Sequence, residues 1–193
     1  QAVHLTMALA QRPVRSVLVI GLGGGHTTGM IAAHPEVEEV IGVELSDSVA
    51  PMLQGLGEHH LHLFERPKFK LLIEDGRNYL LRTKKRFDLI VVNPVRNTTS
   101  GSGFLASEEF FQLCKDHLQE DGMIHLVDCS QDDRIRFLYQ NTVTRVFPHF
   151  FKTGRSFHGF VSKPRLVPQR IRGRLANGAD IRKAQPWFRN PFD

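Results

Sequence analysis

A run of glycines and two carboxylates are the strongest candidates in this sequence for binding a small molecule. The segment VLVIGLGGGHTTGM (residues 17–30) changes from aliphatic residues to Gly21, Gly23 and Gly25. Such a change is typical of a buried strand that turns sharply into a helix, where bare backbone can approach a ligand. The dinucleotide fingerprint G-x-G-x-x-G does not fit, because His26 stands where its third glycine would be. The segment therefore predicts a nucleoside-binding loop without a pyrophosphate site.

The two carboxylates end the next two apolar runs along the chain. Glu44 comes 23 residues after Gly21, and a carboxylate about 20 residues after such a loop can accept both hydroxyls of a ribose. Asp75 stands directly before Gly76, where its carboxylate could accept from the exocyclic amine of adenine. Either acid alone is better explained as a helix cap or a solvated loop residue. The glycines and both acids together, in this order, favour a nucleoside site.

The hydrophobic pattern predicts the elements that hold these residues. Near-continuous apolar runs alternate with helical patterns, which predicts an α/β fold with a doubly wound, mostly parallel sheet. We expect strands at residues 14–21, 37–45, 68–75, 87–93 and 121–129, and helices at 27–34, 46–56, 76–84, 107–118 and 132–147. Residues 150–163 predict a closing hairpin, and the chain from Pro164 is expected to be irregular. Ligands of such sheets bind beyond the carboxyl ends of the strands, where Gly21, Glu44 and Asp75 fall.

Charge separates a body, residues 1–163, from a basic C-terminal tail, residues 164–193. Residues 152–193 carry ten Lys and Arg against two Asp, whereas residues 1–151 carry 15 Lys and Arg against 18 Asp and Glu. A basic tail can mark a contact with nucleic acid. The aromatic residues of this region do not alternate with the basic ones as a stacking platform would. Nucleic-acid binding is therefore not favoured.

Composition and the remaining motifs narrow the class of protein. Hydrophobic residues make up 41% and charged residues 23% of the chain, which is typical of a soluble globular domain. No apolar run approaches the ~20 residues of a membrane span, and no signal peptide is visible, so we expect a cytoplasmic domain. His59, His60 and His62 lie close together in GEHHLHLF. They have no Cys or carboxylate at ligand spacing, so no metal site is expected.

Four segments of the chain together resemble one family. The chain is similar to the spermidine synthase family of polyamine aminopropyltransferases in VLVIGLGGGHTTGMIAAHPEVEEVIGVELSDSV, IEDGRNYLL, FDLIVVNP and FLASEEFFQLCKDHLQEDGMIHLV. The resemblance covers about residues 1–160 and is strongest with the branch in which this domain follows a membrane-embedded segment. It implies a class I methyltransferase-like, Rossmann-like fold, with decarboxylated S-adenosylmethionine as cofactor and putrescine as amine acceptor. It leaves open a homodimer and a membrane-anchored parent protein.

The chain departs from this family at two acids. The family's catalytic acid follows the fourth strand, where this chain has Asn93 before Pro94. An Asp in the family's glycine loop holds the aminopropyl ammonium of the cofactor, and its place is taken by Gly24. An amide cannot accept the proton that an alkylammonium must lose before it attacks. We therefore expect polyamine chemistry to be impaired at both positions.

We expect a domain that binds S-adenosylmethionine, its decarboxylated form or methylthioadenosine. The residues expected along the cofactor tail, at the ribose and at the adenine are, in chain order, Gly21, Gly23, Gly25, Glu44, Asp75 and Gly76. Asn93 would stand at the catalytic position. Two alternatives stay open. One is a methyltransferase acting on another acceptor, because Asn93-Pro94 is half of the N-P-P-aromatic motif of amino-group methyltransferases. The other is a non-catalytic nucleoside-binding module.

Overall fold

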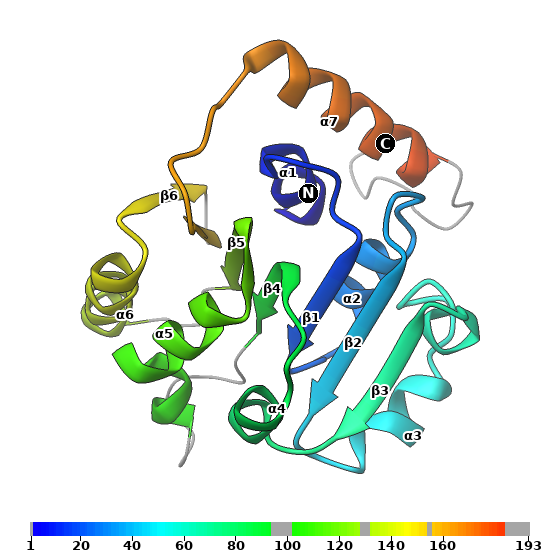
Figure 1. Cartoon of the computed structure of the whole chain (residues 1–193). Coiled ribbons are helices and arrows are strands. Elements are labelled where there is room, and N and C mark those ends of the chain that lie inside the picture. Colours follow the sequence, from blue (N-terminus) through cyan, green and yellow to red (C-terminus); the bar gives the residue numbers. More distant parts are fainter. Residues whose placement is uncertain (1, 94–101, 128–131, 154–155, 184–193) are drawn as a thin grey trace.

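The computed structural model describes residues 2–93, 102–127, 132–153 and 156–183. At its centre lies a seven-stranded sheet in the order β3-β2-β1-β4-β5-β7-β6 (Figure 1). The strands are β1 (Ser16–Ile20), β2 (Glu39–Glu44), β3 (Phe69–Ile73), β4 (Phe87–Val92), β5 (Leu118–Val127), β6 (His149–Thr153) and β7 (Ser156–Phe160). Neighbours among β1 to β5 run parallel, whereas β7 runs antiparallel to β5 and β6. The predicted doubly wound, mostly parallel sheet with a hairpin is confirmed.

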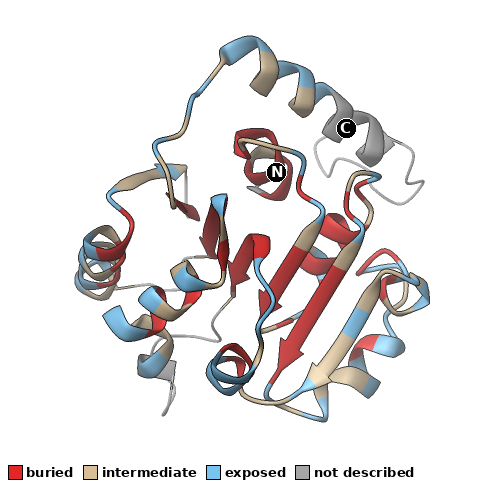
Figure 2. Cartoon of the chain, in the orientation of Figure 1, coloured by how far each residue is buried: buried red, intermediate tan, exposed pale blue. Residues whose placement is uncertain are grey.

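Helices cover both faces of the sheet. They are α1 (Ala2–Leu9), α2 (His26–Ala32), α3 (Val49–Gln54), α4 (Gly76–Arg82), α5 (Glu108–Asp116), α6 (Asp133–Val146) and α7 (Pro168–Lys183), with short 3₁₀ turns η1 (Leu63–Glu65) and η2 (Ser102–Ala106). Successive side chains of a strand point to opposite faces, so Leu18 joins a core with α4, α5 and α6, and Val19 joins one with α1 and α2. Figure 2 shows β1, β4 and most of β2 buried, and β3 more open at the edge.

The boundary between α5 and β5 differs from the predicted one. The helix was expected to reach residue 118, but α5 ends at Asp116 and β5 already begins at Leu118. Leu118 lies opposite Phe87 at the start of β4, and the register then shifts before Leu89 pairs with Met123. Pairing with β4 therefore extends the strand backwards, which the helical spacing of apolar residues could not indicate.

The expectation of an irregular tail was wrong for residues 168–183, because α7 is a helix of 16 residues that lies beside α1 (Figure 1). Arg174 donates from Nη1 to the carbonyl oxygens of Met7 and Ala10, at 3.2 and 2.7 Å. These carbonyls lie in the last turn of α1 and just beyond it, where backbone acceptors lack partners within the helix. Tertiary contacts thus hold a helix whose sequence has little hydrophobic periodicity. Among the described residues, no helix is both long and apolar enough to cross a membrane.

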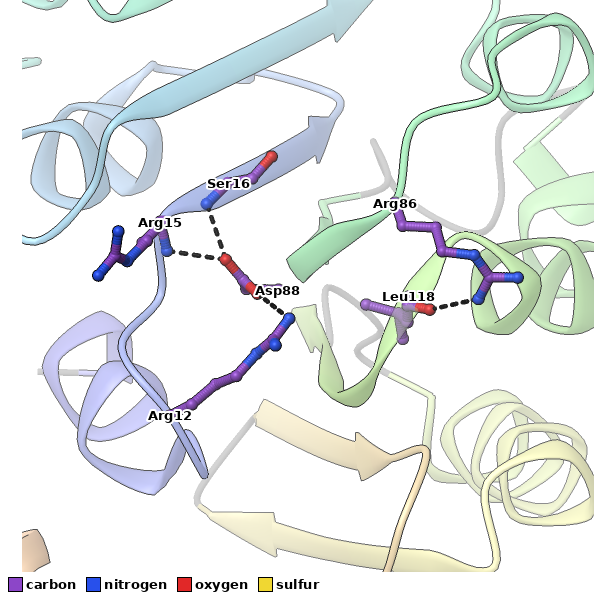
Figure 3. Close-up of polar contacts among 6 residues, drawn as sticks. All are labelled: Arg12, Arg15, Ser16, Arg86, Asp88 and Leu118. Carbon is purple, nitrogen blue, oxygen red and sulfur yellow. Dashed lines mark hydrogen bonds and ion pairs between the residues drawn. The ribbon is translucent and has the colours of Figure 1, made fainter.

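Asp88 connects the amino-terminal ends of β1 and β4, opposite their carboxyl ends (Figure 3). Its Oδ2 accepts from the backbone N–H groups of Arg15 and Ser16, at 2.9 and 3.0 Å, and its Oδ1 pairs with the guanidinium of Arg12. The carboxylate is buried, so these three donors compensate for the loss of water. The start of β1 is thereby fixed against β4, which sets the relative position of their other ends.

Candidate functional site

The candidate site lies where β1, β2, β3 and β4 end, on one edge of the sheet. In the register of the sheet, Ile20 at the end of β1 lies opposite both Val43 and Val92, and Glu44 lies opposite Ile73. The strand order reverses between β1 and β4, and ligands of open α/β sheets bind at such a point. The parallel strands therefore bring together groups that lie far apart in the sequence.

The glycine loop after β1 is formed by backbone shapes that favour glycine. Gly21, Gly23 and Gly25 have φ values of 82°, 54° and 72°, in the left-handed region. A side chain at Gly21 would also collide with the carbonyl oxygen of Asn93. The backbone N–H of Asn93 in turn donates to the carbonyl oxygen of Ile20 at 2.9 Å. The end of β4 and the glycine loop are therefore in direct contact.

Glu44 connects the glycine loop to the end of β2. Its Oε2 accepts from the backbone N–H of Leu22 at 2.9 Å, and its Oε1 accepts from that of Ser46 at 3.2 Å. The residue is only 6% exposed, and it is held by two backbone donors from different loops. The structure thus brings Glu44 to the predicted loop. Its predicted contact with a ribose stays a prediction.

Asp75 and Gly76 form the start of α4. Oδ1 of Asp75 accepts from the backbone N–H of Asn78 at 2.9 Å, so this side chain caps the helix. This is the helix-cap role that the sequence offered as an alternative to adenine binding. A side chain at Gly76 would collide with Ile20, so Gly76 allows α4 to begin close to the end of β1. The predicted contact of Asp75 with adenine and the predicted cofactor contact of Gly76 stay predictions.

Asn93 directly follows β4 and lies beside the glycine loop. A Cβ atom at Gly23 would be 3.2 Å from the Asn93 side-chain nitrogen Nδ2. Pro94, which completes the half motif, and the segment after it lie outside the described residues. The amide therefore lies at the same strand edge as the loop and Glu44. Its predicted place at the reacting centre stays a prediction.

The histidines of GEHHLHLF do not form a metal centre in the part of the chain that the structure describes, where no group of three or more potential metal ligands occurs. His59 is exposed, and His62 pairs with Glu65 through Nδ1 at 2.8 Å. His60 is buried and packs against Gly25 of the loop. No spacing pattern in the sequence predicts this role of His60. Gly29, a small residue inside a helical pattern, was the only local signal of a close neighbour.

Comparison with known proteins identifies the family. The family model of the spermine/spermidine synthase domain matches residues 2–149. The chain belongs to this family. A polyamine aminopropyltransferase of Thermotoga maritima is 32% identical over 120 residues, which cover 62% of this chain and 40% of that protein. One of Aeropyrum pernix is 29% identical over 201 residues, covering 93% of this chain and 64% of that protein. The chain thus spans about 40% of the length of the Thermotoga relative.

Solved structures agree with the spermidine synthase family fold. A spermidine synthase in complex with the transition-state analogue AdoDATO superposes with a TM-score of 0.72 at 24% identity, covering 83% of this chain and 61% of that one. Human methyltransferase-like protein 13 in complex with SAH superposes with a TM-score of 0.71 at 17% identity, covering 98% and 93%. At these identities the likeness shows the fold, which is the predicted methyltransferase-like one.

Proposed function

We propose that this spermidine synthase family domain binds an adenosyl nucleoside with a sulfonium or thioether group: S-adenosylmethionine, its decarboxylated form or methylthioadenosine. The observation that carries the proposal is the hydrogen bond between Leu22 in the glycine loop and Glu44 at the end of β2. It holds a buried carboxylate beside bare loop backbone at the point where the strand order reverses. The adenosyl compounds named for the two structural neighbours support the same ligand class.

The residues present fit a nucleoside. Each oxygen of Glu44 accepts one backbone hydrogen bond in the structure, and a carboxylate has about four acceptor positions, so both oxygens can still accept from ribose hydroxyls. The Asp75 side chain uses Oδ1 for its cap, which leaves Oδ2 to accept from the adenine amine. Gly24 is exposed, with no neighbouring atom within 4 Å of where a Cβ would be. The loop therefore offers backbone and open space to the cofactor tail.

The same residues support binding more strongly than polyamine synthesis. A bound sulfonium nucleoside supplies an activated carbon–sulfur bond, so the protein has only to orient an acceptor and remove its proton. An alkylammonium with a pKa near 10.4, about that of lysine, must be deprotonated before it can attack. Asn93 is an amide and cannot take that proton. Gly24 has no charge with which to hold an aminopropyl ammonium.

A methyltransferase acting on another acceptor is the second candidate. The observation that favours it is the Asn93 amide beside Gly23, because an amide oxygen can accept a hydrogen bond from a neutral amine without titrating. A non-catalytic nucleoside-binding module is the outcome if no transfer occurs. In each case we place the domain in the cytoplasm, alone or as the soluble part of a membrane-anchored protein.

Calorimetric titration tests the proposal. The protein is titrated with S-adenosylmethionine, decarboxylated S-adenosylmethionine and methylthioadenosine, and adenosine diphosphate serves as a control ligand with a pyrophosphate. We expect at least one of the first three to bind and the control not to bind. Failure of all three to bind would contradict the proposed function.

A further inference from the structure

We propose that His60 is a positioning residue that holds the glycine loop in the shape required to receive the nucleoside. The inference rests on the proposed function and extends it to a segment, residues 59–62, that lies between α3 and the 3₁₀ turn η1. This segment contains the histidine cluster noted in the sequence. None of the predicted site residues comes from it.

The segment touches the loop and α2 at three points. The Cβ that Gly25 lacks would be 3.0 Å from the Cβ of His60, and a side chain at Gly29 would collide with the His60 carbonyl oxygen. His26 Nδ1 donates to the carbonyl oxygen of His59 at 3.0 Å. The absence of side chains at the two glycines is therefore what allows His60 to pack directly on backbone. The segment forms a wall behind the loop.

The imidazole of His60 holds this wall in place through both ring nitrogens. The backbone N–H of Leu63 donates to Nδ1 at 3.1 Å, and Nε2 lies 2.6 Å from the carbonyl oxygen of Leu53. Since an N–H can only donate and a carbonyl oxygen can only accept, Nδ1 must be unprotonated and Nε2 must carry the proton. One neutral tautomer thus connects the end of α3 to the start of η1. The ring is 2% exposed.

The backbone after His60 needs such support. Leu61 and His62 have φ values of 64° and 52°, a left-handed conformation that leucine rarely adopts. Conformations of this kind persist where surrounding contacts fix them, and they concentrate at functional sites. Leu61 and Leu63 are fully buried against the core that contains α1 and α2. The His60 hydrogen bonds and this packing together hold the strained turn against the loop.

A segment that already holds the glycine loop in place before the ligand arrives would strengthen nucleoside binding. A loop that is already ordered loses less conformational entropy when its ligand arrives, and small displacements of binding groups are costly. Removal of the imidazole leaves the Leu63 N–H without its acceptor, and it takes one donor from the Leu53 carbonyl, which keeps the hydrogen bond from the Leu56 N–H at 2.8 Å. The segment around His60 then becomes less ordered, and so does the glycine loop that packs on it.

Hydrogen exchange of the ligand-free protein tests the positioning role without any ligand. We expect His60→Ala to speed exchange in peptides covering residues 21–31 by about tenfold, the effect of losing a hydrogen bond of ordinary strength. His59→Ala, which removes the neighbouring exposed ring, is the matched control and should leave these peptides unchanged. Val143→Ala, which shortens a core side chain of α6, controls for general destabilisation. Unchanged exchange at residues 21–31 in His60→Ala overturns the inference.

A second pair of variants approaches the same contact from the loop side. Gly29→Ala should collide with the His60 carbonyl and speed exchange in residues 57–63, whereas Gly173→Ala in α7 meets no atom within 4 Å and should not. His60→Asn keeps an acceptor near Nδ1, and His60→Gln keeps a donor near Nε2. We expect each to restore part of the protection lost in His60→Ala. Equal exchange in the alanine, asparagine and glutamine variants contradicts the hydrogen-bonded role.

Titration then separates this inference from the proposed function. For the nucleoside that binds wild type, we expect His60→Ala to raise the Kd about tenfold, with His60→Asn and His60→Gln between the two. Val143→Ala should leave the Kd unchanged even where it lowers the melting temperature equally. If wild type binds and His60→Ala binds equally well, the inference fails. If wild type binds none of the nucleosides, the proposed function fails, and the exchange result alone decides the role of His60.

Discussion

Glu44 already has two partners in the absence of a ligand. Its carboxylate accepts from Leu22 in the glycine loop and from Ser46 after β2, so it joins two loops at the carboxyl edge of the sheet. The sequence predicted Glu44 as a ribose acceptor from its distance to Gly21. The structure adds that the same side chain fixes the loop, and a substitution therefore acts on both binding and stability.

Glu44→Ala should weaken nucleoside binding, because the ribose hydroxyls lose a charged acceptor worth about 1.5–3 kcal/mol. The expected rise in Kd is roughly 10- to 150-fold by calorimetry. Glu39→Ala, at the amino end of the same strand, is the control. Its carboxylate forms a partly exposed ion pair with Lys85, and such pairs contribute about 0–1 kcal/mol to stability. Equal Kd values for Glu44→Ala and wild type would contradict the assignment.

Asn93→Asp supplies a carboxylate where the family has one. We expect it to create or increase aminopropyl transfer from decarboxylated S-adenosylmethionine to putrescine, because a carboxylate attracts the diamine and accepts or relays its proton. Asn141→Asp, an exposed position on α6, makes the same chemical change elsewhere and should have no effect. Wild-type transfer at a rate that Asn93→Asp does not exceed would show that the amide does not limit the reaction.

At the scale of elements, α1 and α7 stabilise each other, although they lie near opposite ends of the sequence. Arg174 donates to carbonyls near the end of α1, and Arg170 donates to the carbonyl of Gln11 at 3.2 Å. Side chains of α1 in turn pack in the core beside β1 and β4. The basic tail is thus partly explained by these contacts, since two of its arginines bind backbone of the body.

Arg174→Ala should loosen α7 and lower the free energy of unfolding by about 1–2 kcal/mol, the range for hydrogen bonds from a partly exposed charged donor. Urea unfolding measures the change, and limited proteolysis after residue 163 should become faster. Arg172→Ala removes an exposed arginine of the same helix and should change neither. Unaltered proteolysis in Arg174→Ala would show that other contacts hold α7.

At the scale of the whole molecule, buried histidines connect α1 to the sheet and its hairpin. Thr6 of α1 lies 2.7 Å from His125 Nδ1 of β5, which lies 3.4 Å from His158 Nδ1 of β7. His158 Nε2 is 2.7 Å from the hydroxyl of Thr153 in β6. Thr6, His125 and His158 are all buried. Protonation of these two histidines therefore affects the stability of the whole fold.

Burial lowers the pKa of His125, of His158 and of a third buried histidine, His34, which follows α2. The pKa of His125 falls to about 3, because the ring is buried and lies beside His158, and that of His158 falls to about 4 through burial. The pKa of His34 falls to about 4 through burial and the nearby His4 and Lys68. In the unfolded chain each would have a pKa near 6.5. The folded state thus favours the neutral rings.

The free energy of unfolding should be greatest above pH ~6.5 and fall as the pH drops from there towards 4, because unfolding then takes up protons. Each histidine contributes a slope of about 1.4 kcal/mol per pH unit inside that window. His34→Gln should reduce this slope by the contribution of about one proton, when the free energy of unfolding is measured with urea between pH 7.5 and 5. His59→Ala, at an exposed position, should leave the slope unchanged. A flat profile in wild type would contradict the buried neutral rings.

The sequence by itself determined the features that local patterns encode. Apolar runs with strand spacing and helical repeats are set by residues close in the chain, so the α/β fold, the parallel strands and the glycine loop could be predicted. The carboxyl ends of parallel strands meet on one side of the sheet, which is why Gly21, Glu44 and Asp75 were expected together.

Only the tertiary structure decided the contacts between residues far apart. The α7 helix depends on carbonyls at the other end of the chain, so its own weak periodicity concealed it. His60 packs on a loop some 35 residues earlier, which no spacing rule indicates. Such contacts arise from how separate elements pack, and packing is specified by the fold as a whole rather than by any short segment.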